Sequence, residues 1–371
     1  MQKLDVSVVI CTRDRNEYLA KCVSSLLKQN YPPKEIIIID DYSDTNVAKF
    51  FAKEFYQLFS NLKMLFNFRT RLILLRNKDH SGIVKSRNLG IKVASGDIIA
   101  FLDDDSLAHP NWLKNLAKHY HNQTIVGVGG PVVESRRMKT PQKPIKNLAY
   151  IRNGKVISNL RVRKFKEIGY LPRKFVPFLQ GGNMSFRRDV LLKISGGDAN
   201  LVGNSYREET DLCFKVAKMG KIMFEPYAVT YHNTAEKGGS RTIINFQLDR
   251  FLYYMFRNTT YFFFKHFDLR KAFSMTMSSF KKQVRLIDEN KTGLTRDFLK
   301  IHSKRASVFS IIKGCLTGFY CWLKNRTKEV EFIFSQPSTI KTYKLIILGS
   351  TIKFLEVENK TKFLKKLLGM S

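Results

Sequence analysis

The chain has 371 residues, 44% of them hydrophobic and 12% aromatic, which excludes an intrinsically disordered protein. Its 64 lysines and arginines against 31 acidic residues give a net charge of +33, which favours polyanionic partners such as nucleic acid or an anionic membrane surface. The five cysteines show no Cys-x-x-Cys spacing, so we expect reduced thiols in a cytosolic setting. We find no signal-peptide pattern and no uncharged apolar run long enough to span a bilayer, and therefore expect neither secretion nor a spanning helix.

Short apolar strands alternate with amphipathic helices over the first hundred residues. The predicted strands are 6–11, 36–39, 72–75 and 98–102, and the predicted helices run to about residue 30, through 50–56 and over 83–94. Asp14, three residues before Glu17, resembles a capping box for the first helix. Strands that are apolar throughout are buried on both faces, which is typical of a parallel, doubly wound α/β sheet.

Three consecutive aspartates, Asp103, Asp104 and Asp105, follow the strand 98–102. If the strand persists, Asp103 and Asp105 project to the same side. Crowded carboxylates repel one another unless a cation lies among them, and a hard divalent ion prefers carboxylate and phosphate oxygens. A solvated acidic turn is the alternative for such a triplet taken alone.

Polar residues also end the first two strands, at Thr12-Arg13 and Asp40-Asp41. In a doubly wound sheet, ligands bind outside the carboxyl ends of the strands. These residues and the aspartate triplet should therefore converge on one edge of the sheet, which favours a binding site over an acidic turn.

Beyond Pro110 the pattern predicts a helix near 112–116, a strand at 125–128 and a loop-rich, basic segment from 136 to 174. Order resumes at 178–186, and His232 ends another apolar stretch. The basic stretch 236–241 is either a loop that closes over phosphates or a solvated linker. We expect one domain over about 1–240, divided near residue 130, and a mostly helical, aromatic and basic region over 241–371.

Several motifs, in this order and spacing, closely resemble the family 2 glycosyltransferases over roughly residues 5–245. They are 6–12, 35–43, 86–90, 96–105, 181–188, 207–213 and 231–232. The resemblance implies a GT-A fold, a nucleotide-diphosphate sugar donor, inversion at the anomeric carbon, and Mg²⁺ or Mn²⁺ as cofactor. It also implies that residues 1–240 are the catalytic domain, with a donor half to about 130 and an acceptor half after it. Tyr42 stands where the family usually has glycine, which puts the shape of that turn in question.

The resemblance also implies roles for single residues. Asp105 would bind the metal, His232 would complete the metal site or touch the diphosphate, and Asp103 or Asp104 would make the second contact, near the ribose or sugar. The remaining donor contacts would come from Thr12 and Arg13 beside the nucleotide, Asp41 on the base, and Arg87 on the base or diphosphate. Gly182, Asn183 and Asp211 would border the sugar or acceptor.

The pair Glu208-Glu209 resembles the family's Glu-Asp pair, whose second member deprotonates the acceptor hydroxyl. We expect Glu209 to be this base, with Glu208 as its rival. Glu208 and Asp211 have a structural alternative, because acids at a helix start interact favourably with the helix dipole.

Aromatic and basic residues are interleaved at 251–265, 309–313 and 363–368. Such segments suit helices lying in a membrane interface; a packed helical subdomain is the alternative. A nucleic-acid-binding protein or an inactive scaffold would also fit the charge, but no nucleic-acid-binding motif is present, so we expect no nucleic-acid partner.

The resemblance predicts a metal-dependent glycosyltransferase that moves a sugar from a nucleotide-diphosphate donor to a glycan or lipid-linked acceptor. We expect a UDP-sugar as the donor, with dTDP- and GDP-sugars as the alternatives. We expect it to act in cell-surface polysaccharide or glycoconjugate synthesis, as a peripheral protein on the cytoplasmic face of the cell membrane. The family's processive synthases carry spanning helices and a Gln-x-x-Arg-Trp motif, and without these we expect one sugar per encounter.

Overall fold

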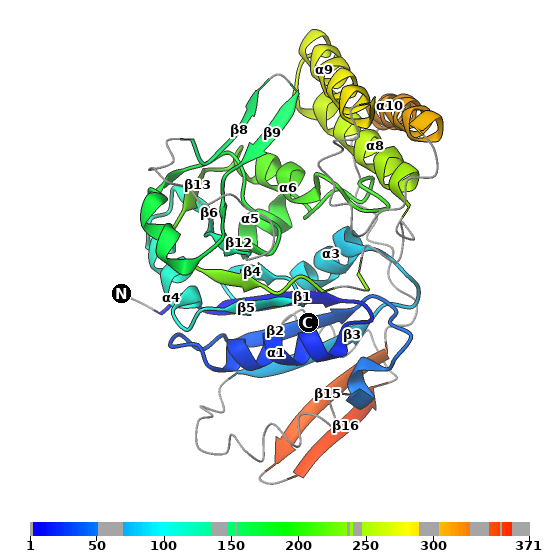
Figure 1. The fold of residues 1–371 in the computed structure, drawn as a ribbon. Helices are drawn as coiled ribbons and strands as arrows, with labels where there is room; N and C mark the ends of the chain where they lie inside the picture. Colours follow the sequence, from blue (N-terminus) through cyan, green and yellow to red (C-terminus); the bar gives the residue numbers. More distant parts are fainter. Residues whose placement is uncertain are drawn as a thin grey trace.

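The computed structural model describes residues 3–50, 70–134, 147–152, 154–235, 238–239, 247–288, 304–326, 341–348 and 351–357. Its centre is a ten-stranded sheet with the order β11-β13-β6-β12-β4-β1-β2-β3-β15-β16 (Figure 1). The strands of this sheet are β1 (Val6–Thr12), β2 (Glu35–Asp40), β3 (Arg71–Arg76), β4 (Ile98–Leu102), β6 (Ile125–Gly129), β11 (Lys174–Phe175), β12 (Asn183–Arg187), β13 (Lys221–Phe224), β15 (Lys341–Leu348) and β16 (Thr351–Val357).

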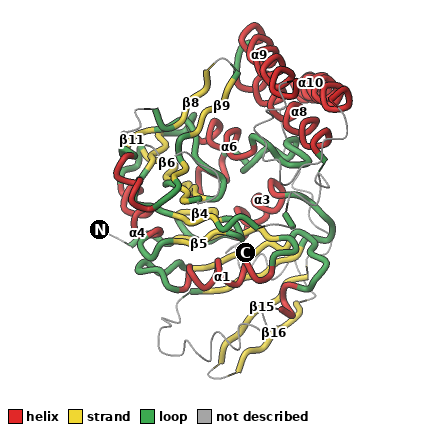
Figure 2. Tube along the Cα trace, in the orientation of Figure 1, coloured by secondary structure: helices red, strands yellow, loops and turns green. Residues whose placement is uncertain are grey.

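The strands β4, β1, β2 and β3 pair in parallel, which confirms the predicted doubly wound core. Their side chains alternate between two cores, so that Val8 and Ile10 lie on one side of β1 and Val9 on the other. Helices cover both faces (Figure 2). On one face lie α1 (Asn16–Leu27) and α4 (Trp112–Ala117), and on the other α3 (Ile83–Val93), α5 (Arg188–Lys193) and α6 (Glu208–Val216).

A four-stranded sheet with the order β10-β7-β14-β5 lies beside this core. Its strands are β5 (Ser106–Ala108), β7 (Val132–Val133), β10 (Arg161–Val162) and β14 (Thr230–His232). The described part of the basic segment is more regular than expected, because it holds the hairpin of β8 (Ala149–Arg152) and β9 (Lys155–Ser158), together with β10 and the 3-10 helix η2 (Phe165–Tyr170). Another 3-10 turn, η1 (Lys118–His121), follows α4.

The C-terminal region contains the predicted helices, α8 (Leu248–His266), α9 (Leu269–Asp288) and α10 (Lys304–Arg326), which lie together at one end of the molecule (Figure 1). It also contains an unpredicted hairpin, β15–β16, which extends the sheet beyond β3. The aromatic run Tyr261–Phe264 of α8 is buried, so the expectation that 251–265 faces a membrane is wrong for this run, which is core.

Among the described residues, the part of α10 at Lys304–Asn325 is the one helix that is long and apolar enough to cross a membrane, where the sequence predicted none. The expected helix through 50–56 is described only to residue 50, and 363–368 lie outside the described residues. All five cysteines are described and are free thiols.

Candidate active site

A cavity of about 350 Å³ opens at the carboxyl ends of β1, β2 and β4, where the start of α6 forms another of its walls. It brings together the predicted site residues Thr12, Arg13, Asp41, Arg87, Asp103, Asp104, Asp105, Gly182, Glu208, Glu209 and His232. The convergence follows from topology, since parallel strands present their carboxyl ends on one edge and β4 is flanked there by β1 and β12.

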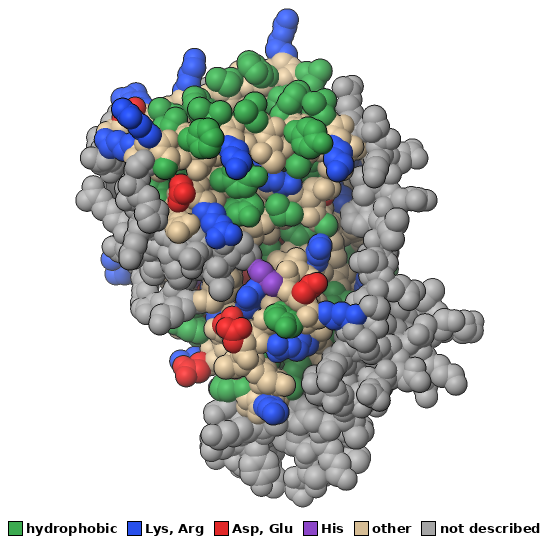
Figure 3. All heavy atoms as spheres, turned by 90° about the vertical axis from the view of Figure 1, so that its right-hand side faces the viewer, with side chains coloured by type: hydrophobic (Ala, Val, Ile, Leu, Met, Phe, Trp, Pro, Cys, Tyr) green, Lys and Arg blue, Asp and Glu red, His purple; other side chains and the backbone are tan. Residues whose placement is uncertain are grey.

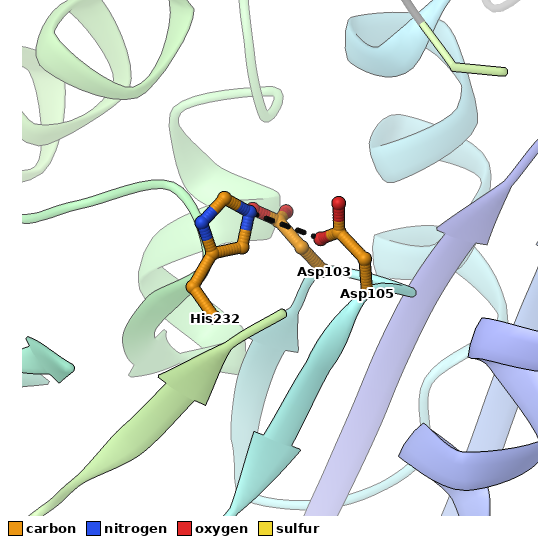
Figure 4. Close-up of side chains that lie close together, drawn as sticks. All are labelled: Asp103, Asp105 and His232. Atoms are coloured by element: carbon orange, nitrogen blue, oxygen red, sulfur yellow. Dashed lines mark ion pairs between the residues drawn. The ribbon is translucent and has the colours of Figure 1, made fainter. Parts of the chain in front are cut away.

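Asp103, Asp105 and His232 form one cluster, in which one ligand atom from each residue lies within 4.8 Å of the others (Figure 4). The pairing of β14 with β5 explains it: His232 lies opposite Ser106, the residue after Asp105. His232 Nε2 is 3.2 Å from Asp105 Oδ1. The Asp103 side chain is 38% exposed whereas that of Asp105 is 4% exposed, so only the Asp103 carboxylate faces the open cavity broadly.

Asp104 is not part of this cluster. Its carboxylate accepts hydrogen bonds from Thr12 Oγ1 at 2.8 Å and from Arg15 at 2.9 Å. Burial raises the Asp104 pKa to about 6, although Arg15 opposes the shift. The Asp105 carboxyl is also buried, but hydrogen bonding and charge from His232, followed by the charge of Arg15, hold its pKa below the ordinary value. Asp103, and not Asp104, shares the cluster with Asp105 and His232.

His232 is oriented by a residue that the sequence did not single out. Glu134, which follows β7, lies 3.4 Å from His232 Nδ1, and its other oxygen accepts a hydrogen bond from Arg161 at 2.6 Å. Burial opposes the charged imidazole, but the hydrogen bonds from His232 to Asp105 and Glu134 raise the His232 pKa to about 9. A carboxylate behind an imidazole is the usual arrangement that fixes the ring of a metal-binding histidine.

Arg87 links the two ends of the cavity. Its guanidinium pairs with Glu208, lies 3.2 Å from Asp103 Oδ1 and donates to the Gly181 carbonyl at 3.0 Å. Burial raises the pKa of Glu208 to about 7; the charge of Arg87 lowers it, and that of Glu209 raises it further. Arg87 and Glu208 are therefore mutually engaged, which leaves Glu209 as the carboxylate of the pair without this partner.

Glu209 is the second residue of α6 and is half-buried on the cavity wall. The residue before α6, Arg207, has a left-handed backbone with φ of 77° and stacks on the ring of Tyr206. Its Nε, like one terminal nitrogen of Arg13, is buried with no hydrogen-bond partner in the described part of the chain. Both arginines line the cavity, and unpaired guanidinium donors suit an oxyanion such as a phosphate.

Asp41 holds the neighbouring loop in place. Its carboxylate accepts hydrogen bonds from Asn77 Nδ2 and Ser81 N, both at 2.8 Å, and from Gly82 N at 2.9 Å, and it lies 2.7 Å from His80 Nδ1. A carboxylate offers about four acceptor sites. The expected hydrogen bond from a nucleotide base would therefore have to replace one of these contacts.

Two predicted site residues do not line the cavity with their side chains. Asn183 donates to the carbonyls of Pro131 and Ala228, and Asp211 is buried against Lys265 and His266 of α8. The expectation that they border the sugar or acceptor is corrected by these partners, which give both a structural role. Gly182, in contrast, lies so close to Asp103 that a Cβ would collide with its carboxylate.

Tyr42, where the resembling family has glycine, keeps the backbone conformation that favours glycine, with φ of 63°. Tyr42 therefore adopts, at the turn after β2, a backbone conformation that residues other than glycine rarely adopt. The basic loop expected over 236–241 is described only at Gly238 and Gly239, where Arg15 donates to the Gly238 carbonyl at 3.3 Å.

The cluster of Asp103, Asp105 and His232 fits a divalent metal. Two carboxylates and an imidazole are ligands that Mn²⁺ accepts, and Mg²⁺ prefers the carboxylates alone. The imidazole must be neutral to bind a metal, so binding would release the proton that His232 now shares with its carboxylate partners.

Several curated glycosyltransferases are similar to this chain. A glucosyl-dolichyl phosphate glucuronosyltransferase from Haloferax volcanii is 29% identical over 206 residues, which cover 53% of this chain and 57% of that protein. A pre-mycofactocin glycosyltransferase from Mycobacterium tuberculosis is 24% identical over 62% of this chain and 43% of its own length. The chain thus spans about half the length of these curated relatives.

Among solved structures, the mannosyltransferase PcManGT from Pyrobaculum calidifontis, in complex with GDP-Man and Mn²⁺, has a TM-score of 0.51 and 13% identity, covering 86% of this chain and 88% of that one. This likeness shows the GT-A fold. Residues 7–195 match the profile described as glycosyl transferase family 2, and this chain belongs to that family.

Proposed function

We propose that this chain transfers a sugar, with inversion, from a nucleotide-diphosphate donor to a hydroxyl of a glycan or lipid-linked acceptor. The observation that carries the proposal is the cavity itself, with the cluster of Asp103, Asp105 and His232 on one wall and Glu209 on another. The dolichyl-phosphate relative supports a lipid-linked acceptor, and the GDP-Man complex supports a nucleotide-sugar donor. We place a UDP-sugar first, before dTDP- and GDP-sugars.

In this proposal, Mg²⁺ or Mn²⁺ at Asp103, Asp105 and His232 would supply positive charge to the leaving diphosphate. Arg13 and Arg207 bind phosphate oxygens through their unpaired donors, and Thr12 borders the nucleotide. Glu209 accepts the proton of the acceptor hydroxyl. The oxygen of that hydroxyl forms a bond to the anomeric carbon, while the bond between the anomeric carbon and the diphosphate oxygen breaks. The transition state has oxocarbenium character.

We further propose that the enzyme works on the inner face of the cell membrane, in cell-surface polysaccharide or glycoconjugate synthesis. A lipid-linked acceptor would be found there, and the net charge of +33 suits an anionic surface.

The test is calorimetry with UDP, dTDP and GDP, each with Mn²⁺, Mg²⁺ or EDTA. We expect one nucleotide to bind with a metal-dependent heat that Asp105→Asn removes, whereas Asp189→Asn, at an exposed acid on α5, leaves it unchanged. A panel of sugars on that nucleotide, read by nucleotide release, then identifies the donor. Unchanged metal-dependent heat in Asp105→Asn would overturn the metal site, and failure to bind any nucleotide would overturn the function.

A further inference from the structure

Helix α10 carries a stripe of large apolar side chains that is exposed on the described structure. The side chains of Phe309, Leu316 and Tyr320 are 66%, 66% and 63% exposed. Ile312, Phe319 and Leu323 are also exposed. Five of these positions (309, 312, 316, 319 and 323) advance by three or four residues, and Tyr320 lies four residues after Leu316, so all six occupy a single face of the helix.

The opposite face of α10 is fixed to the protein. Its buried residues are Ser307, Ile311, Gly314 and Gly318, again at helical spacing. A Cβ at Gly314 or Gly318 would collide with the backbone of α8, at Tyr253 or Arg257 respectively, so the two glycines permit a close helix–helix contact. The apolar stripe is therefore held facing outward, along the surface of the protein.

Basic residues border the stripe. Arg305, Lys313 and Lys324 are exposed on α10, and the sequence of α10 contains no acidic residue. The neighbouring helix α9 adds exposed Leu269 and Phe273. Figure 3 shows apolar side chains gathered over the end of the molecule that holds α8–α10, with lysines and arginines among them.

A helix packed on its own protein usually presents charged residues to water on the outer face. α10 presents six large apolar side chains there, with cations at the margin. If a second copy of this chain covered this face, its own cations would lie against the cations of the first copy. Because each molecule has a net charge of +33, the two copies would repel each other. An anionic lipid surface satisfies both parts of the pattern, because headgroups attract the lysines and arginines and the acyl boundary accepts the apolar side chains.

We propose that the outer face of α10, extended by α9, docks on an anionic membrane surface, with α10 lying in the plane of the interface. This docking face is made of α10 and α9, and its docking on a membrane does not require that the chain transfers a sugar.

One consequence does rest on the proposed function. The loop before α6 contacts α8 at two places. Asn258 of α8 donates a hydrogen bond to the Val202 carbonyl at 2.8 Å, and Tyr206 packs edge-on against Phe251 of α8. Tyr206 also lines the cavity. α8 thus connects the docking face to a cavity wall, which would bring a lipid-linked acceptor near Glu209.

The test is co-sedimentation of the full chain with phosphatidylcholine vesicles, with and without phosphatidylglycerol. The Leu316→Ser/Tyr320→Ser double variant should weaken partitioning onto anionic vesicles about tenfold or more, because two apolar side chains no longer leave water. The control, Leu192→Ser/Tyr227→Ser, removes an exposed leucine and tyrosine elsewhere and should partition like the wild type. Thermal unfolding of each variant verifies that it is folded.

Lys313→Gln/Lys324→Gln should reduce binding to anionic vesicles and should make that binding less dependent on salt concentration. The weak binding to vesicles of phosphatidylcholine alone should not change. Equal partitioning of the two serine double variants would overturn the proposal. So would sedimentation velocity showing a wild-type dimer, without vesicles, that Leu316→Ser/Tyr320→Ser dissociates, because a second copy would then cover the face.

Discussion

Two clusters of buried acids lie near α6, and they differ in how completely their charges are balanced. Asp198 and Asp211, between α6 and α8, are met by Lys265, Tyr261 and His266. Both aspartates have pKa values below the ordinary value: burial alone would raise them, but the positive charge of Lys265 outweighs it. This cluster is closed, and neither acid lines the cavity.

The second group consists of the acids that line the cavity, Asp103, Asp104, Asp105, Glu208 and Glu209, and their charges are balanced unevenly. The Asp105 pKa is lowered, whereas burial raises the Asp104 and Glu208 values to about 6 and about 7. Acids whose environments push their pKa values apart are typical of sites that bind charged ligands or move protons. The comparison indicates that residue type alone does not mark a site; the balance of partners and access to a cavity do.

The largest expected effect is on turnover, from Glu209→Gln. Removing a general base costs about 10²- to 10⁴-fold, while the nearly isosteric amide should leave donor binding unchanged. Nucleotide release with a sugar acceptor, together with calorimetry of the donor, separates the two effects.

The matched variant is Glu208→Gln. It deprives the buried Arg87 of a charged partner and should therefore lower thermal stability as well as activity. If Glu209→Gln retained turnover and Glu208→Gln lost it with donor binding and stability intact, the base role would pass to Glu208.

Next in size is Lys265→Met, which tests the closed cluster. It leaves Asp198 and Asp211 buried without their ammonium partner, and breaking a buried pair costs about 3 kcal/mol or more. We expect that loss in the urea-derived free energy of unfolding and unchanged donor affinity. Lys271→Met, at an exposed position nearby, is the control; a stability loss no larger than that of the control would contradict a structural role for the cluster.

Much of the core could be predicted because its signals are local. Strands apolar throughout, with helices between them, specify a doubly wound sheet, and strand ends specify its binding edge. The capping box was wrong because Asp14 adopts a left-handed backbone, with φ of 54°, and accepts a hydrogen bond from Asp44 N across the turn after β2. The Asp14 carboxylate therefore makes a tertiary contact and does not cap α1.

The residues that were missed depend on contacts distant in sequence. Glu134 is a single acid after a two-residue strand, and only the pairing of β7 with β14 brings it beside His232. Arg15 reaches Asp104 and Asp105 across the sheet edge. Asn183 and Asp211 occupy motif positions, but side-chain direction is decided by packing partners that spacing does not reveal.

A smaller effect is expected from Glu134→Gln, which alters the orientation of His232 without removing a cluster ligand. Loss of a carboxylate behind a metal-binding histidine typically lowers metal affinity about 10- to 100-fold. Mn²⁺ titration followed by electron paramagnetic resonance measures this directly. Glu167→Gln, another buried acid, is the control; equal Mn²⁺ affinity in the two variants would show that Glu134 serves only the fold.

The smallest effect is the pH dependence of stability from the closed cluster. The folded-state pKa of Asp198 is lowered to about 2 by Lys265, against the effect of burial, and that of Asp211 is lowered as well. At acid pH the unfolded chain therefore binds more protons than the folded chain. The stability that these aspartates contribute is fully present above about pH 5 and is lost as the pH falls toward their folded-state pKa. Asp198 alone should cost about 1 kcal/mol by pH 3. Urea unfolding at pH 6 and pH 3 measures the difference. Lys265→Met should flatten it, since the charge of this ammonium is the largest of the effects that lower both pKa values. An unchanged slope in that variant would assign the acid sensitivity to other carboxylates.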